Sequence, residues 1–301
     1  MKEITLAEPV ITQLMGLPAG VDIIALAPED MDVTDRNAFL VGVQQGILSY
    51  LITMKTYGEF SPQWIANSLT NRDRFIACKP VDQLKRRLGS DFAVVVGGAP
   101  SLRPENIPNN AEIYCCWNAA QKLLDAGVQP DIVGHVDPNS RSGYATDFGP
   151  FARLIATPQA DPKFLECEGG LYGYFDPCNP ANAWFAAHHG CGDHQHIVGL
   201  VSNMLVNAAI YAGHKTIALM GCDFAWTEGE YDSAKGCEIT KLVNRHGIPI
   251  KTYHVFQICA QGLWATRNYY PDVKIYQTSE TALDVQGVEY RPIEAICPTL
   301  L

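Results

Sequence analysis

The chain is 301 residues long, with 47% hydrophobic and 18% charged residues and a formal net charge of −10 at pH 7. It is long enough for one large domain or a main domain with a smaller appendage, and its acidic balance argues against nonspecific binding to nucleic acid or anionic membranes. No run reaches the roughly 18 apolar residues of a membrane span, and the N-terminus lacks the apolar core of a signal peptide. We therefore expect a soluble cytoplasmic protein whose ten cysteines are reduced thiols.

Residues 1–89 are predicted to form a mainly helical N-terminal region. A first helix is expected over residues 34–58, with Thr34 or Asp35 as its N-cap and Gly58 as its stop. Two more helices are expected in the segments SPQWIANSL and KPVDQLKRRLG, because each has proline in its first turn.

From residue 90 to 226, short apolar strands alternate with helices. The expected strands are, in chain order, FAVVVGG, AEIYCCW, PDIVGHVD, ARLIATP and KTIALMG. One helix is expected in NAAQKLLDAG, with Asn118 at its cap and Gly127 at its C′ position. Another is expected in SNMLVNAAIYAG, beginning at Ser202 or Asn203. This alternation predicts a Rossmann-like α/β domain, in which a parallel sheet is flanked by helices.

Two segments fit this alternation less well. Residues 158–197 are rich in Gly, Pro, Cys, His and aromatic residues, and we predict an irregular lid or insertion there. Residues 227–301 are expected to form a C-terminal α/β extension packed on the same domain. This extension should contain a helix in YHVFQICAQGLWATRNYY and strands in VKIYQTS and GVEYRPI.

Small or polar residues follow four of the predicted strands. Ligands bind beyond the carboxyl ends of the strands in an open parallel sheet, so these positions form the candidate binding site. The first turn has no lysine after its glycines, as a P-loop would, and Ala99 and Leu102 replace the glycines of a dinucleotide fingerprint. A tight turn without a ligand is the structural alternative. The candidates are Gly97, Gly98, Pro100, Ser101, Asn118, Asp137, Asn139 and Asp223, with Ser202 and Asn203 at a helix start.

Four of these segments together resemble a known family. VVVGGAPSL, CCWNAA, GVQPDIVGHVDPN and VSNMLVNAAIYAGHKTIALMGCDFAW occur in this order. They resemble the 6-hydroxymethylpterin diphosphokinase MptE-like superfamily, which also contains the motility-associated factor glycosyltransferases, and more distantly the bacterial sialyltransferases. The resemblance implies a nucleotide-activated donor bound at the strand ends by the glycine turn, Asn118, Asp137 and Asp223. Ala99 stands where the family usually has its second glycine.

The resemblance leaves two reactions open. The pterin enzyme transfers diphosphate from ATP and needs Mg²⁺ held by closely spaced acids, whereas this chain has the single Asp137 in HVDPN. An Asp-Pro pair here is similar to the glycosyltransferase members, so we expect a glycosyltransferase with a nucleotide-sugar donor and a hydroxyl acceptor. The alternatives are an ATP- and Mg²⁺-dependent diphosphokinase, with Mg²⁺ on Asp137, and a noncatalytic nucleotide-binding module.

The histidine-rich segment AAHHGCGDHQHIVGL precedes the last helix of the predicted sheet domain. The sialyltransferase-like relatives use a histidine shortly before this helix as the base that takes the acceptor proton. The resemblance therefore implies His194 or His196 as the catalytic base, with Asp193 as an orienting partner. The ordinary pKa of histidine, about 6.5, suits this role.

A zinc site is a competing interpretation of the same part of the chain. Cys167, Cys178, Cys191 and His194 are ligand types that zinc prefers. Their spacing matches no common zinc finger or ribbon, so the sequence predicts no firm metal or cofactor.

Overall fold

The structure is a computed structural model, and it divides the chain into two compact units, Met1–Pro62 and Gln63–Leu301. The described residues are 2–4, 25–27, 58–90, 92–139, 144–149, 152–176, 180–191, 200–229 and 234–296. In the first unit, strands β1 (Lys2–Ile4) and β2 (Ala25–Ala27) pair antiparallel. The helix predicted over 34–58 lies outside the described residues except for Gly58, which is helical, so the predicted stop there is wrong.

The second unit contains a nine-stranded sheet in which every neighbouring pair of strands is parallel. The strand order is β13-β12-β9-β4-β5-β6-β7-β8-β3. The strands are β3 (Lys79–Pro80), β4 (Phe92–Val96), β5 (Ala111–Cys116), β6 (Ile132–His135), β7 (Arg153–Ala156), β8 (Gly170–Gly173), β9 (Thr216–Met220), β12 (Lys274–Gln277) and β13 (Glu289–Tyr290). The predicted Rossmann-like class is confirmed, and the C-terminal extension adds β12 and β13 to the same sheet.

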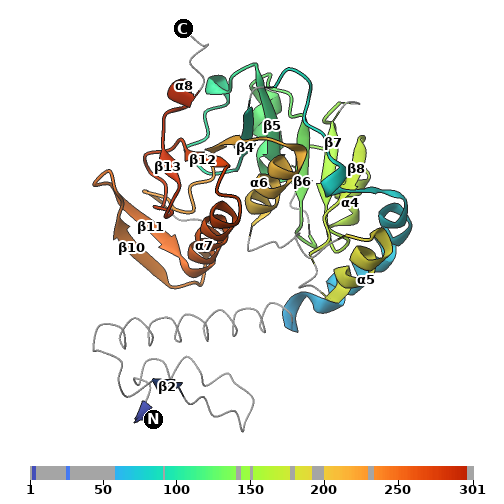
Figure 1. Cartoon of the computed structure of the whole chain (residues 1–301), viewed down its shortest axis with the longest axis horizontal. Helices are drawn as coiled ribbons and strands as arrows, with labels where there is room; N and C mark the ends of the chain where they lie inside the picture. Colours follow the sequence, from blue (N-terminus) through green and yellow to red (C-terminus); the bar gives the residue numbers. More distant parts are fainter. Residues whose placement is uncertain are drawn as a thin grey trace. The chain divides into compact units, whose positions relative to one another are not determined.

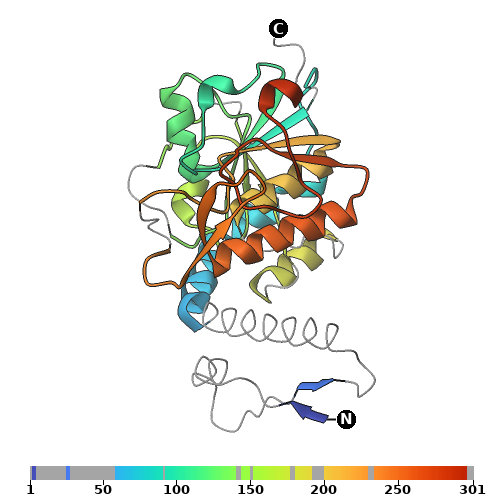
Figure 2. The same cartoon turned by 90° about the vertical axis from the view of Figure 1, so that its left-hand side faces the viewer.

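Helices cover both faces of the sheet (Figure 1, Figure 2). They are α3 (Trp117–Asp125), α4 (Pro162–Leu165), α5 (Pro180–His189), α6 (Val201–Ala212), α7 (His254–Tyr269), α8 (Ile293–Ile296) and the helical residues 63–77. Because successive side chains of a strand point to opposite faces, Ala93 and Val95 join the cluster under α6 and α7. Val94 and Val96 join the cluster under α3, α4 and α5. Both faces of β4 are thus buried, which explains its continuous apolar sequence.

The chain reverses its direction across the sheet between β4 and β9. Strands β5, β6, β7 and β8 follow one another on one side of β4, and α6 then returns the chain to β9 on the other side. Residues 93–96 pair with residues 217–220. Such a reversal opens a crevice at the carboxyl ends of the two strands. This rule therefore predicts a ligand site at the ends of β4 and β9.

Several local predictions are corrected by the structure. Residues 79–89 are not a helix, because Lys79 pairs with Tyr172 of β8 and the Arg87 side chain bonds the Asp131 carboxylate at 2.8 Å. They contain β3 and the short 3₁₀ helix Val81–Gln83 instead. The predicted helix SPQWIANSL extends to residue 77.

Two strand features were not predicted. Strand β8 lies within the segment 158–197 and pairs with β7. Strands β10 (Ile239–Val243) and β11 (Pro249–Tyr253) form an antiparallel hairpin in a segment for which no helix or strand is predicted.

A buried ionic cluster lies at the second residue of β5. Glu112 is fully buried, accepts a hydrogen bond from Arg153 of β7 and lies 2.5 Å from His214 Nε2, just after α6. Burial raises the pKa of Glu112, but the hydrogen bonds from His214 and Arg153 outweigh burial and leave that pKa below its usual value. This cluster joins two strands and a helix at the amino ends of the strands, opposite the ends that carry the candidate site.

Candidate functional site

The turn after β4 continues the pairing of β4 with the end of β9. Gly97 N donates to Met220 O at 2.8 Å, and Ala99 N donates to Gly221 O at 2.9 Å. A Cβ on Gly97 would lie 2.4 Å from Gly221 O, closer than real Cβ atoms come to a carbonyl oxygen. Gly97 is therefore required by the close approach of two backbones.

Gly98 lies against the first turn of α3. It is exposed, and a Cβ there would lie 3.0 Å from Nδ2 of Asn118, which is also exposed. Helix α3 begins directly after β5 with Cys116 at its N-cap, so Asn118 is in the first turn and the predicted cap at Asn118 is wrong. The first amide groups of a helix have no intrahelical acceptor and favour anions. We call Gly97, Gly98, Trp117 and Asn118 the glycine cradle.

Asp223, just after β9, binds hydroxyl groups of two different segments. Ser101 Oγ donates to Asp223 Oδ1 at 2.7 Å, and Thr281 Oγ1 donates to Oδ2 at 3.4 Å. The residue is only 2% exposed, and burial raises its pKa to about 6, although hydrogen bonds from Ser101, Ser279 and Thr281 oppose this rise. Asp223 therefore joins the glycine turn to the loop that follows β12.

The loop after β6 carries two more candidates, Asp137 and Asn139, and both are exposed. Two hydrogen bonds fix the backbone of this loop. The Asp137 carbonyl accepts from Asp161 N at 2.9 Å, and the Pro138 carbonyl accepts from Asn67 Nδ2 at 2.9 Å. Because β4, β5 and β6 are neighbours, the structure brings Gly98, Asn118 and Asp137 to the same edge of the sheet. The exposed Pro100 belongs to the same turn as Gly98.

His135, the last residue of β6, is not among the residues predicted from the sequence. Its ring is 2% exposed and packs against Trp117 of the glycine cradle, with ring centroids 4.7 Å apart. Burial lowers the pKa of His135 to about 4, so the ring is neutral at neutral pH. Its position two residues before Asp137 in HVDPN was the available signal.

Helix α6 has Leu200 at its N-cap and begins at Val201. Ser202 and Asn203 lie in its first turn, so the prediction that one of them begins the helix is wrong. Both are buried. The Asn203 amide donates to the Cys259 carbonyl at 2.8 Å and so ties α6 to α7. A contact of Ser202 or Asn203 with a donor stays a prediction.

The predicted catalytic residues His194 and His196, with Asp193, lie outside the described residues, and their role stays a prediction. Two other histidines of the same segment end α5. His189 Nε2 lies 2.7 Å from the Phe75 carbonyl, and His188 stacks on Trp184.

Two of the zinc candidates, Cys178 and His194, also lie outside the described residues. Cys167 is buried and Cys191 is half-buried. Within the part of the chain that the structure describes, no three His, Cys, Asp or Glu side chains gather closely enough to hold a metal ion. The zinc site, and Mg²⁺ on Asp137, therefore stay predictions.

A family model decides the kinship of the chain. The model described as 6-hydroxymethylpterin diphosphokinase MptE-like matches residues 66–229. The chain belongs to this MptE-like family. The resemblance inferred from the sequence is thus confirmed, and the match includes the glycine cradle, Asp137 and Asp223.

Three solved structures were compared with this MptE-like chain, and one of them, with a TM-score above 0.5, shares its fold. The MAf glycosyltransferase from Magnetospirillum magneticum AMB-1 matches with a TM-score of 0.58 and 18% identity, over 77% of this chain and 39% of that one. The chain thus spans well under half of that structure. The Campylobacter jejuni sialyltransferases CstII (TM-score 0.34, 15% identity, 67% of this chain and 86% of that one) and Cst-I (0.36, 12%, 70% and 84%) also match. Comparison with curated proteins found no match.

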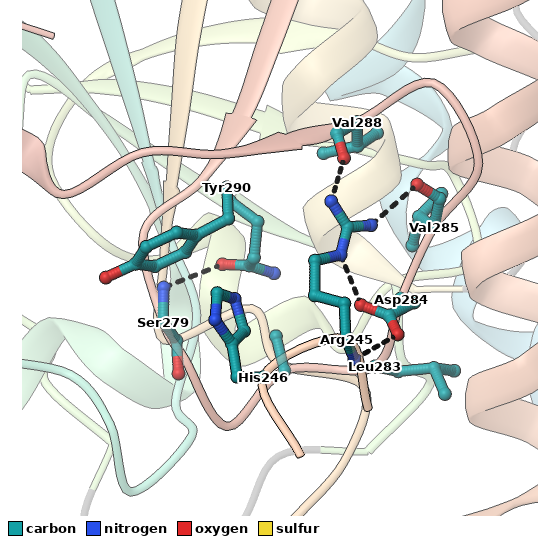
Figure 3. Close-up of a pocket in the computed structure, with 10 residues that line it drawn as sticks. Arg245, His246, Ser279, Leu283, Asp284, Val285, Val288 and Tyr290 are labelled. Atoms are coloured by element: carbon teal, nitrogen blue, oxygen red, sulfur yellow. Dashed lines mark hydrogen bonds and ion pairs between the residues drawn. The ribbon is translucent and has the colours of Figure 1, made fainter. Parts of the chain in front are cut away.

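No described helix of this MptE-like protein has the length and apolar character of a membrane span. A small hollow, with room for about one water molecule, lies where β12 and β13 end, beside the β10–β11 turn (Figure 3). It is lined by Arg245, His246, Gln277, Ser279, Ala282, Leu283, Asp284, Val285, Val288 and Tyr290. This hollow has no signal in the sequence, because its wall includes the turn of the β10–β11 hairpin, for which no strand is predicted.

Proposed function

We propose that this protein is a transferase that binds a nucleotide-activated donor on the glycine cradle, and that it is a glycosyltransferase. The observation that carries the proposal is the exposed Gly98 beside Asn118 and the start of α3. It lies at the sheet edge where open α/β folds bind ligands. The fold shared with the MAf glycosyltransferase agrees with this function.

The cradle offers backbone amides rather than a lysine to the donor phosphate. The amide groups at the start of α3 and of the glycine turn would neutralise the phosphate charge, which suits a chain with a net charge of −10. The Asn118 amide and the Asp137 carboxylate would fix the nucleoside on the neighbouring strand ends. The oxygen of the acceptor hydroxyl attacks the sugar carbon, the bond from that carbon to phosphate breaks, and the nucleotide leaves. His194 or His196 takes the hydroxyl proton.

A diphosphokinase reaction is the second candidate, and the description of the matching family model favours it. In that reaction the exposed Asp137 would hold Mg²⁺ together with the ATP phosphates. Glycosyl transfer should survive a chelator. Diphosphate transfer should need Mg²⁺ and should be lost in Asp137→Asn.

Nucleotide binding is tested by thermal unfolding with CMP, UDP, GDP and ATP. A ligand at 100 times its Kd adds about 2.7 kcal/mol of stability. Gly98→Val should abolish the stabilisation, because its side chain fills the cradle. Gly170→Val is the matched control, since a Cβ on this exposed β8 glycine meets no described atom within 4 Å. If no nucleotide stabilises the wild type, or if both variants respond like the wild type, the proposal is wrong.

A further inference from the structure

Asp223 lies in a stretch of backbone that two later segments hold in place. Phe224, which follows it, has a φ of 52° and is the one non-glycine residue of the described chain with a positive φ. The Asp223 carbonyl accepts from Leu283 N at 2.8 Å, and the Phe224 carbonyl accepts from Thr252 Oγ1 at 2.8 Å. Strained residues of this kind persist where their surroundings fix them, and they cluster at functional sites. The fold therefore sets the position of the Asp223 side chain.

The partners of the Asp223 carboxylate are hydroxyl groups. Ser101 donates to its Oδ1 at 2.7 Å, Thr281 donates to its Oδ2 at 3.4 Å, and Ser279 also bonds it. Within the described part of the chain, no arginine, lysine or histidine forms an ion pair with Asp223. Burial raises its pKa to about 6 against the effect of the hydroxyls, and no charged group contributes to this shift. The negative charge of ionised Asp223 therefore has no cation to neutralise it among the described residues.

Few titratable groups lie on the elements around Asp223. Residues 92–102, which form β4 and its turn, contain none. The neighbouring cations Arg103 and Lys122 bond carbonyls of the glycine turn instead, both at 2.9 Å. The Cys222 thiol is buried, and its pKa is raised so far above the usual value that it stays neutral. The remaining groups are Glu280 and Asp284 in the loop after β12, and His254 at the start of α7.

The protonation state of Asp223 decides what the Ser101 hydroxyl can do. When Asp223 is ionised, the Ser101 O–H donates to the carboxylate, so the serine oxygen can only accept from a ligand. When Asp223 is protonated, its own O–H donates to Ser101 Oγ, and the serine O–H is free to donate elsewhere. Ser101 is partly exposed and belongs to the same turn as Gly98. Its hydroxyl can therefore donate to a ligand on the glycine cradle only when Asp223 is protonated.

A phosphate on the glycine cradle would favour the protonated form of Asp223 for two reasons. Phosphate oxygens accept hydrogen bonds, so they gain one from Ser101 only in that form. The ionised carboxylate would also be a second negative charge close to the phosphate, and a like charge raises the pKa of an acid. Because both effects act in the same direction, phosphate binding and protonation of Asp223 should be coupled.

We propose that Asp223 is a positioning residue that takes up a proton when a nucleotide phosphate binds, and so turns the Ser101 O–H toward that phosphate. The proton comes from solvent and returns there when the nucleotide leaves. This inference rests on the proposed function, because it needs a phosphate on the cradle. Asp223→Asn should mimic the protonated state, since its amide N–H can donate to Ser101 Oγ at every pH.

Isothermal titration calorimetry with nucleotide sugars at pH 5 and pH 7.5 tests this coupling. The probes are ADP-, UDP-, GDP- and CDP-glucose, because their phosphodiester charges stay constant in this range, whereas a terminal phosphate titrates with a pKa of about 6. We expect the wild type to bind about ten- to thirtyfold more weakly at pH 7.5, since only the protonated fraction is competent. Asp223→Asn should bind equally at both pH values, and more tightly than the wild type at pH 7.5.

Proton uptake separates this role from a merely structural one. At pH 7, titrations in two buffers of different ionisation enthalpy should show that the wild type takes up at least about half a proton more than Asp223→Asn. Thr281→Val is the matched control, because it removes the more distant hydroxyl of the same carboxylate and should keep the pH dependence of the wild type. If Asp223→Asn does not fold, Ser101→Ala takes its place. That variant should lose affinity at pH 5 and show a smaller pH dependence.

The outcomes distinguish this inference from the proposed function. Nucleotide-sugar binding with the same pH dependence and the same proton uptake in the wild type and Asp223→Asn contradicts the role of Asp223, and it leaves the proposed function intact. Weaker binding by Asp223→Asn than by the wild type at pH 7.5 also contradicts this role. If none of the four nucleotide sugars binds at either pH, the proposed glycosyltransferase function is wrong, and this inference is wrong with it.

Discussion

The hydroxyl of Ser101 lies 2.7 Å from the carboxylate of Asp223, so the turn after β4 is held by a buried acid at the end of β9. The other carboxylate oxygen accepts from Thr281 in the loop after β12. Three strand ends of the sheet therefore meet at one titratable group. Its protonation state therefore affects the stability of the folded protein.

Asp223→Asn should change how stability depends on pH. The pKa of Asp223 is raised to about 6 in the folded protein, so its contribution to stability is complete below the unfolded pKa and is lost as pH rises through about 6. An amide does not titrate, so Asp223→Asn does not lose stability in this way. From about pH 4 to pH 7.5, the free energy of unfolding of the wild type should therefore fall by roughly 2–3 kcal/mol relative to that of Asp223→Asn. Chemical denaturation at both pH values measures the gain.

All other titrating groups are the same in the two proteins, so their pH dependence cancels in this difference. A difference that stays constant from pH 4 to 7.5 would show that Asp223 titrates as an ordinary exposed acid.

Alanine should have different effects on stability at the two neighbouring glycines of the cradle. Gly97→Ala drives a methyl group into the Gly221 carbonyl and should cost about 1–3 kcal/mol or more. Gly98→Ala meets only the flexible end of Asn118 and should stay within about 0.5 kcal/mol of the wild type, while it weakens nucleotide binding. Urea denaturation gives both values. Equal stability of the two variants would mean that β4 and β9 do not approach as described.

The buried cluster at Glu112 should be one of the more sensitive sites for stability. Glu112→Gln leaves Arg153 and His214 without their carboxylate, and breaking such a pair costs about 3–5 kcal/mol. Because the pKa of Glu112 is lowered in the fold, this loss should be largest near neutral pH and shrink as pH falls through the folded pKa. Thermal unfolding across pH checks both points. Asp73→Asn, in an exposed pair with Arg72, is the control and should melt like the wild type.

Replacing Asn71 should lower the stability of the fold. Its buried amide donates to the carbonyls of Pro158 and Ala160, both at 2.9 Å, and so fixes the helix of residues 63–77 to the loop after β7. Asn71→Ala leaves these carbonyls unpaired and should cost about 1–3 kcal/mol. The neighbouring exposed Thr70→Ala should change stability by no more than about 0.5 kcal/mol in the same denaturation assay. Similar losses in both variants would contradict the anchoring role.

The central sheet could be predicted from the sequence because its strands are buried on both faces. Continuous apolar runs such as residues 92–96 have few alternatives in a chain with helices between them. The edge elements could not be predicted in this way. Strand β8 is only GLYG, β10 is largely exposed, and β11 mixes polar and apolar residues. Their pairing depends on contacts that are distant in sequence.

The sequence could predict where the residues of the candidate site lie in the sheet, but not which hydrogen bonds they form. The rule on strand ends placed Gly98, Asn118 and Asp137 on one edge, where the structure has them. It could not indicate that the Asp223 carboxylate is enclosed by hydroxyl groups, since the loop carrying Thr281 follows more than fifty residues later. The hollow beside Tyr290 depends on the same late segment of the chain.

The central claim is that a nucleotide phosphate lies on the glycine cradle, and hydrogen–deuterium exchange with mass spectrometry tests it most directly. The probe is whichever of CMP, UDP, GDP and ATP stabilises the protein most, at saturating concentration. Slower exchange in peptides that cover residues 97–101 and 117–119, and its absence in Gly98→Val, is the predicted result. Unchanged exchange there, or protection confined to the β10–β11 hairpin, would contradict the claim.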